Sequence, residues 1–207
     1  MKKRDIIISS ILLLIFISMY LLVLFNKNVI DEVIYNFIIS VRCDFLDNYF
    51  KIITHLGDPI LVSIVVIIGV ILFKKRDKIL LLISVGGGTL INTIIKNIIC
   101  RERPDHLKLI KQGGYSFPSG HSMITICLYG LLIYLVLKNI KNKYIKIISI
   151  IILSIIIISL PISRIYVGVH YPTDVIAGLC LGGIILIFSI NSINSVWGNK
   201  NEEGSSK

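Results

Sequence analysis

Six long apolar runs dominate the sequence and limit the folds that it can adopt. The first, residues 6–25, follows a basic start and is long enough to cross the hydrocarbon core of a bilayer, which takes about 20 helical residues. Because that core holds no water to satisfy backbone N–H and C=O groups, such segments cross it as helices. The sequence therefore predicts an all-α integral membrane bundle of six transmembrane helices. The other five runs cover residues 59–73, 79–100, 122–137, 145–162 and 175–190.

Residues 29–53 follow a different pattern, in which large apolar side chains recur at every fourth position with acidic residues between them. A spacing of four keeps side chains on one face of an α-helix. The pattern predicts an amphipathic interfacial helix that lies on the bilayer surface. A helix packed on the outside of the bundle is an equally compatible alternative. The apolar positions are Val29, Val33, Phe37, Val41, Phe45, Tyr49 and Ile53.

The composition excludes several classes of protein. With 55% hydrophobic residues and a mean hydropathy of +0.84, the chain is too apolar for a soluble domain of its size.

No linker rich in Pro, Gly or Ser divides the chain, so we expect one transmembrane domain at residues 1–198 and a polar cytoplasmic tail at residues 199–207. Its four cysteines form no CxxC pair, which argues against a zinc site or a disulfide framework.

The net charge of +10 indicates membrane topology rather than nucleic-acid binding, because the basic residues form short clusters between apolar runs. Residues 74–78 and the lysines of residues 138–146 fall on the same side of the bilayer as the amino terminus. Lysine and arginine accumulate on the cytoplasmic side of membrane proteins. We therefore expect both termini in the cytoplasm and no nucleic-acid partner.

Polar stretches border four of the predicted helix ends, and all four fall on the non-cytoplasmic side when the crossings are counted. They are residues 96–103, 118–121, 163–164 and 170–174. Ionisable groups at membrane depth are costly and gather around functional sites. We therefore expect these stretches to share one site on the extracytoplasmic face.

Three of these residues, Lys96, Arg103 and Arg164, bring positive charge to the site. Arginine presents a planar fork of donors that suits phosphate oxygens, and lysine acts as a point charge. Pro118 and Ser119 precede a helix whose first N–H groups, with the Ser119 hydroxyl, add uncharged donors, and Gly120 permits close backbone approach. The set predicts a site for a tetrahedral oxyanion such as phosphate.

Two histidines supply candidate chemistry. His170 lies four residues before Asp174, a spacing that lets the carboxylate orient the imidazole for attack on phosphorus. His121 is a candidate acid for the leaving group and base for water. We expect no metal and no cofactor, because the nearby cations would repel a divalent ion. His55 and His106 lack a comparable partner in the sequence and are not assigned a function.

The polar stretches resemble the three motifs of the type 2 phosphatidic acid phosphatases. Lys96 to Pro104 is similar to the first motif, Pro118 to His121 to the second, and Ser163 to Asp174 to the third. The resemblance implies a membrane-bound, metal-independent phosphatase with six crossings that acts on a lipid phosphate or pyrophosphate. Members act on phosphatidate, phosphatidylglycerol phosphate or undecaprenyl pyrophosphate, and no motif here selects among them.

The resemblance also implies a role for each matching residue. The nucleophile would be His170, the orienting partner Asp174 and the general acid and base His121. The phosphate would be bound by Lys96, Arg103, Ser119, Gly120 and Arg164.

Two other functions fit parts of the pattern. A transporter or anion-binding membrane protein also needs a cationic rim, but mere capture needs neither an acid nor an oriented nucleophile. The vanadate-dependent haloperoxidases share the motif pattern, and six membrane crossings argue against that reading. The sequence indicates a lipid substrate and the bilayer as partners, and no particular oligomeric state.

Overall fold

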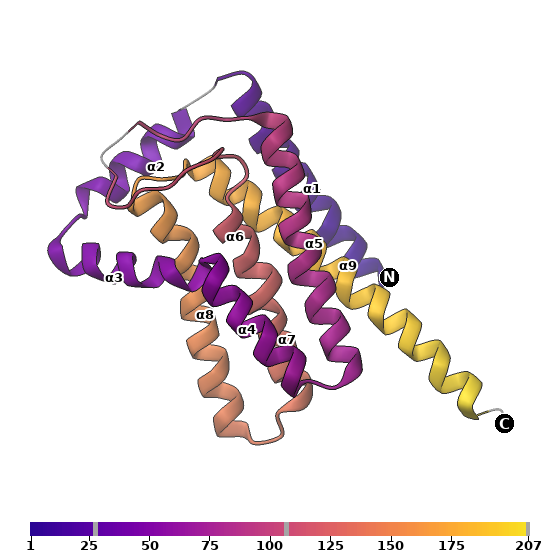
Figure 1. Cartoon of the computed structure of the whole chain (residues 1–207). Coiled ribbons are helices and arrows are strands. Elements are labelled where there is room, and N and C mark those ends of the chain that lie inside the picture. Colours follow the sequence, from indigo (N-terminus) through magenta and orange to yellow (C-terminus); the bar gives the residue numbers. More distant parts are fainter. Residues whose placement is uncertain (27–28, 106–107, 206–207) are drawn as a thin grey trace.

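The chain folds into a bundle of helices, and no strand occurs in residues 1–26, 29–105 and 108–205, which the computed structural model describes (Figure 1). In chain order the helical elements are α1 (Lys3–Leu24), α2 (Val29–Ser40), α3 (Asp44–Thr54), the 3-10 turn η1 (His55–Gly57), α4 (Pro59–Leu72), α5 (Lys75–Ile99), α6 (Gly120–Ile124), the π-helical η2 (Thr125–Gly130), α7 (Leu131–Asn139), α8 (Lys143–Tyr166) and α9 (Pro172–Ser205).

Five helical stretches among the described residues are long and apolar enough to cross a membrane: Lys3–Leu24, Lys75–Ile99, Gly120–Asn139, Lys143–Tyr166 and Pro172–Trp197. The remaining predicted crossing is bent. Helix α4 has only 14 residues, and the stretch Asp44–Gly57 joins it at an angle of 50°. Counted as one bent crossing, this pair brings the total to six, so the predicted all-α membrane bundle is confirmed.

The amphipathic segment differs from the expectation of one helix over residues 29–53. The chain breaks between Ser40 and Asp44, where the backbone N–H of Cys43 donates to the hydroxyl of Tyr166 at 3.4 Å. This contact with the end of α8 replaces a helical hydrogen bond. The apolar positions before and just after the break still face outward, since Phe37 is 68% and Phe45 75% exposed.

Helix α9 packs against α1, α5 and α6, and two glycines allow the approach to α6. A Cβ atom at Gly178 would lie 2.5 Å from the carbonyl oxygen of Ser119, and one at Gly182 would lie 2.7 Å from that of Met123. Both distances are too short for real atoms. The two glycines therefore hold the start of α6 close against α9.

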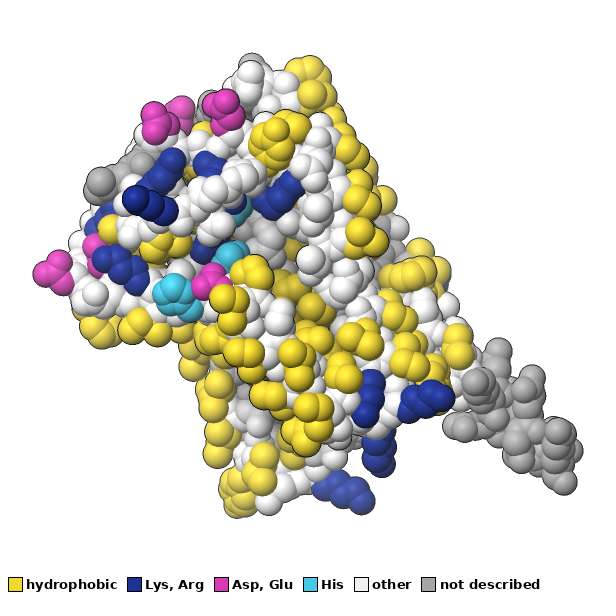
Figure 2. Space-filling view, in the orientation of Figure 1, with side chains coloured by type: hydrophobic (Ala, Val, Ile, Leu, Met, Phe, Trp, Pro, Cys, Tyr) yellow, Lys and Arg dark blue, Asp and Glu magenta, His cyan; other side chains and the backbone are white. Residues whose placement is uncertain are grey.

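Charge is distributed unevenly along the bundle. Figure 2 shows hydrophobic side chains over α4 and α8, whereas acidic, basic and histidine side chains gather over α2 and α3 at the upper end. Basic side chains also lie at the opposite end. This pattern suits a protein whose middle contacts hydrocarbon and whose ends contact water.

Candidate active site

A cavity of about 260 Å³ opens at the end of the bundle near α2 and α3, between α4, α5, α6 and the turn that joins α8 to α9. Six of the eight residues predicted from the sequence line it, although they come from four separate segments of the chain. They are Lys96, Arg103, Gly120, His121, Arg164 and His170. The other two, Ser119 and Asp174, are buried behind the wall of the cavity.

A tight turn after α8 places His170 in this wall. Gly168 adopts a left-handed backbone with a φ of 76°, which glycine tolerates without strain. The turn directs the backbone N–H groups of Val169 and His170 to the carbonyl oxygen of Arg164, each at 3.2 Å. The backbone of His170 is therefore held by Arg164, which also supplies one of the cations of the cavity.

The two ring nitrogens of His170 have different partners. Nδ1 lies 3.4 Å from Oδ2 of Asp174, and Nε2 lies 3.1 Å from Nη1 of Arg103. Because a guanidinium only donates, Nε2 accepts and the ring proton belongs on Nδ1. Burial lowers the pKa of His170 to about 3, against the opposing hydrogen bond with Asp174. The ring is therefore neutral near pH 7, with the lone pair of Nε2 directed toward Arg103 and the cavity.

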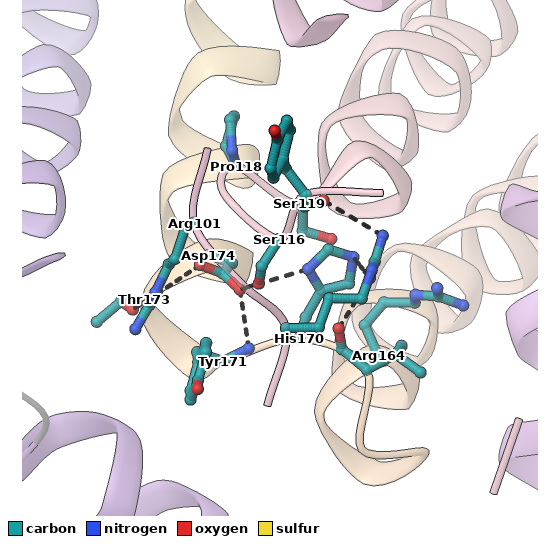
Figure 3. A network of polar contacts seen from close by, with 12 residues as sticks. Arg101, Ser116, Pro118, Ser119, Arg164, His170, Tyr171, Thr173 and Asp174 are labelled. Atoms are coloured by element: carbon teal, nitrogen blue, oxygen red, sulfur yellow. Dashed lines mark hydrogen bonds and ion pairs between the residues drawn. The ribbon is translucent and has the colours of Figure 1, made fainter. Parts of the chain in front are cut away.

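Asp174 is held as a carboxylate by several donors, which converge on it in Figure 3. The backbone N–H of Tyr171 donates to Oδ2 at 2.9 Å, and the hydroxyl of Ser116 donates to the same oxygen. Arg101 donates from Nη1 to Oδ1 at 2.5 Å. A carboxylate with this many donors is fixed in orientation, and it fixes the imidazole beside it.

Arg101 joins Asp174 to the start of α2. Its Nη2 lies 2.8 Å from Oδ2 of Asp31, a residue that is only 3% exposed. Asp31 also accepts the backbone N–H of Thr173 at 2.8 Å, in the first turn of α9. Sequence patterns identify neither residue: Arg101 is not one of the residues that match the first motif, and Asp31 is one of several acidic residues in the amphipathic pattern of residues 29–53.

The three predicted phosphate-binding cations already have hydrogen-bond partners. Lys96 donates to the carbonyl oxygens of Tyr115 and Ser116, at 2.6 and 3.2 Å. Arg103 donates to the carbonyl of Val169 at 2.8 Å. These bonds bring positive charge from α5 and from the loop after it to one wall of the cavity.

Arg164 is the most buried of the three cations, with 1% of its surface exposed. It donates to the hydroxyl of Thr54, and its Nη2 donates to Gln112 Oε1 at 2.9 Å. Its buried Nε has no hydrogen-bond partner among the described residues. An unpaired donor on a buried cation is costly, and an anionic ligand would satisfy it.

Ser119 and Gly120 start α6, as predicted, but only Gly120 faces the cavity. The backbone N–H of Ser119 donates to the carbonyl oxygen of Asp174 at 3.0 Å, and its hydroxyl lies 2.9 Å from that of Ser122. Ser119 thus connects the starts of α6 and α9. A phosphate contact from Ser119 stays a prediction.

His121 faces the cavity with a carboxylate beside it. Its Nε2 lies 3.1 Å from Oδ1 of Asp58, at the bend before α4. The view that His55 lacks a partner is wrong, because its Nδ1 lies 2.7 Å from Oδ2 of the same carboxylate. The sequence signal for these contacts was Asp58 itself, an acidic residue directly before Pro59 and at the same end of the bundle as the motifs. His106 lies outside the described residues.

The sequence matches a known protein family over more than half of its length. Residues 77–197 match the PAP2 superfamily, and that range contains all eight predicted site residues. The chain belongs to the PAP2 superfamily. It is therefore a membrane phosphatase, and the family supports a lipid phosphate as the substrate class.

Individual relatives point the same way. Phosphatidylglycerophosphatase B of Bacillus subtilis (strain 168) is 36% identical over 170 residues, covering 79% of this chain and 83% of that protein. An undecaprenyl-diphosphatase of Sulfolobus acidocaldarius is 31% identical over 128 residues, covering 58% of each chain.

The fold is also similar to a solved structure. The crystal structure of a transmembrane PAP2 type phosphatidylglycerolphosphate phosphatase from Bacillus subtilis superposes with a TM-score of 0.78 at 28% identity. The alignment covers 94% of this chain and 98% of that one.

Proposed function

We propose that this PAP2 phosphatase cleaves the phosphate ester or pyrophosphate of a membrane lipid through a phosphohistidine intermediate on His170. The observation that carries the proposal is the pairing of this ring: Nδ1 lies beside Asp174, and Nε2 beside Arg103 in the wall of a cationic cavity. A neutral imidazole held in this way has its nucleophilic lone pair directed toward the place where an anion would bind.

In the first step Nε2 of His170 forms a bond to phosphorus while the bond from phosphorus to the ester oxygen, or to the bridging oxygen of a pyrophosphate, breaks. When the substrate phosphate binds, Arg103 stops donating to Nε2 and donates to a phosphoryl oxygen instead. The lone pair of Nε2 is then free to attack phosphorus. Asp174 stabilises the imidazolium that forms, because its carboxylate already accepts from Nδ1. His121, across the cavity, gives its proton to the departing oxygen.

In the second step water attacks phosphorus and the bond to His170 breaks, which releases inorganic phosphate. His121 takes a proton from that water and is ready to protonate the next leaving group. Protons balance over the cycle, since the one given in the first step is regained in the second.

The charge that builds on the phosphoryl oxygens would be stabilised by Lys96, Arg103 and Arg164. Three cations around the cavity supply the charge that a divalent metal supplies in other phosphatases, so we propose metal-independent catalysis. In the described part of the chain, no three His, Cys, Asp or Glu side chains come together as a metal site.

The lining of the cavity supports lateral access for the lipid. Beyond the charged end it continues along Val62 of α4 and along Gly88 and Thr89 of α5. Thr89 is also an exposed residue. We propose that the lipid tail leaves the cavity between these two helices while its phosphate stays among the cations.

A bulky residue at this opening tests the path. Thr89→Trp is expected to reduce hydrolysis of long-chain lipid phosphates, while activity on a short, soluble phosphate ester is kept. The control is Leu90→Trp on the neighbouring position, which is 62% exposed and does not line the cavity. Equal losses on long and short substrates in Thr89→Trp would contradict lateral access.

Within the substrate class, the relatives favour phosphatidylglycerol phosphate, with undecaprenyl pyrophosphate as the alternative. The direct experiment is an assay of both lipids and of phosphatidate, with purified wild type and His170→Ala in liposomes. We expect phosphate release from at least one lipid, unchanged by EDTA and abolished in His170→Ala. Loss of activity with EDTA would contradict metal independence, and full activity in the variant would exclude the nucleophile.

A further inference from the structure

The bend between η1 and α4 presents a carboxylate to the second catalytic histidine. Asp58 lies between Gly57 and Pro59, and its Oδ1 is 3.1 Å from Nε2 of His121. The other oxygen, Oδ2, is 2.7 Å from Nδ1 of His55. One carboxylate therefore joins a histidine in the cavity, whose side chain is 11% exposed, to a histidine at the surface, whose side chain is 66% exposed.

Gly57, in the same bend, packs closely against the ring of His121. A Cβ atom at Gly57 would collide with Cδ2 of His121, so only glycine allows this approach. The hydroxyl of Tyr129 donates to the carbonyl oxygen of Leu56 at 2.7 Å and ties the turn to η2. The position of Asp58 relative to His121 is thus fixed by the fold.

We propose that Asp58 is the positioning residue for His121, holding its Nε2–H so that Nδ1 exchanges the proton with the leaving oxygen, and that His55 steadies the carboxylate from the surface. The proposal rests on the proposed function, in which His121 is the general acid. Nδ1 of His121 makes no hydrogen bond to a described residue, which leaves it available to a substrate.

The charges around His121 explain the need for a carboxylate. To act as an acid the ring must carry a positive charge, which its burial disfavours first, and the nearby Arg164 and Arg103 disfavour it further. Lys96 adds a third cation to the same cavity. Asp58 is the acidic group that opposes this repulsion, and its bond to Nε2 also selects which nitrogen faces the substrate. The site then contains two Asp–His pairs, one for the nucleophile and one for the acid.

The proton accounting assigns each nitrogen one task. In the first step the Nδ1 proton passes to the lipid oxygen as its bond to phosphorus breaks, and the Nε2–H stays with Asp58. In the second step Nδ1 regains a proton from the attacking water. Asp58 remains a carboxylate throughout, so it positions and stabilises the ring without touching the substrate.

Leaving groups of different acidity separate this role from a merely structural one. Departure of p-nitrophenolate needs little protonation, whereas an alkoxide needs a full proton transfer. The measurement is kcat/KM, which reports the steps up to alcohol release, for a series of aryl and alkyl phosphates. It compares wild type, His121→Asn, Asp58→Asn and the control Asp44→Asn, which removes an exposed carboxylate at the start of α3.

We expect His121→Asn to lose about 10²–10⁴-fold on alkyl phosphates and little on p-nitrophenyl phosphate, as is typical for loss of a general acid. Asp58→Asn should show the same dependence on the leaving group, and Asp44→Asn should match wild type. His55→Ala removes only the surface contact and should lose about fivefold on alkyl substrates, the equivalent of about one hydrogen bond. This milder variant keeps the test valid if Asp58→Asn folds poorly.

A uniform loss across leaving groups in Asp58→Asn, with His121→Asn still sensitive to them, would overturn the proposal and leave the proposed function standing. If the loss of kcat/KM in His121→Asn did not depend on the leaving group, His121 would not be the general acid. The proposed role of Asp58 would then fail as well. Wild-type values for alkyl phosphates in both Asp58→Asn and His55→Ala would also overturn the proposal.

Discussion

Arg101 and Asp174 form a buried ion pair, with Nη1 of the guanidinium 2.5 Å from Oδ1 of the carboxylate. The same guanidinium is 2.8 Å from Asp31 of α2. A helix at the surface of the bundle is thereby connected to the carboxylate that orients His170. Arg101 acts through Asp174 and does not line the cavity of the proposed reaction.

We predict that Arg101→Gln lowers both stability and kcat. Removing one partner of a buried ion pair leaves two carboxylates uncompensated, which costs about 3–5 kcal/mol. Misplacement of the catalytic group should lower kcat by about a hundredfold, with a smaller change in KM. Thermal unfolding in detergent and steady-state kinetics measure the two effects. The control is Glu102→Gln, an exposed neighbour, and an active Arg101→Gln enzyme of normal stability would contradict the assignment.

Close packing of α9 on α6 gives a second prediction. Gly178→Ala should destabilise the protein by about 1–3 kcal/mol, because its Cβ would lie 2.5 Å from the carbonyl oxygen of Ser119. Gly86→Ala is the matched control, since its Cβ would meet nothing within 4 Å. We expect the control to keep or raise the midpoint of thermal unfolding. Equal midpoints for the two variants would contradict the packing argument.

The pKa of His170 predicts a pH dependence of stability. Burial lowers this pKa from 6.5 to about 3, so the unfolded chain binds the proton more readily than the folded one. The stabilising contribution of the neutral ring is therefore complete above pH 6.5 and decreases as the pH falls toward 3. Unfolding midpoints measured from pH 8 to pH 4 should fall more steeply for wild type than for His170→Gln. Parallel curves would show that the ring is not held neutral.

We propose that the active site faces the extracytoplasmic side, with both termini in the cytoplasm, and two native cysteines provide the test. Cys43 and Cys100 are exposed near the end of the bundle that carries the cavity, whereas Cys127 and Cys180 are buried. A membrane-impermeant maleimide should therefore label wild type in intact cells. The double variant Cys43→Ser, Cys100→Ser is the control and should stay unlabelled. Labelling of wild type only after the membrane is permeabilised would reverse the orientation.

Local patterns were enough to predict the long apolar helices and to single out residues that the fold brings to one cavity. Hydrophobic runs located the crossings, because each must satisfy its backbone within the segment. The pairing of His170 with Asp174 was predictable from their short separation in sequence, although His170 lies in the turn before α9, which begins at Pro172. Short-range spacing therefore accounts for the contact between the proposed nucleophile and its carboxylate.

The remaining parts of the site depend on contacts between distant segments. Asp31 and Thr173 are 142 residues apart in sequence, and no periodicity connects them. Asp58 reaches His121 because the chain bends between η1 and α4. In the sequence alone this position is only the edge of an apolar run. The break near Cys43 likewise depends on Tyr166, at the end of another helix. Sequence patterns do not report such tertiary contacts.

The central claim is that phosphate passes through a covalent bond to His170, and trapping that species tests it most directly. His121→Asn, given p-nitrophenyl [³²P]phosphate, should still be phosphorylated, because this leaving group needs little protonation, but should lose the phosphate slowly. Rapid quenching should then recover a base-stable, acid-labile label on the peptide that contains His170. No label should appear when His170→Ala is combined with His121→Asn. A label on another residue, or turnover without any labelled protein, would contradict the account.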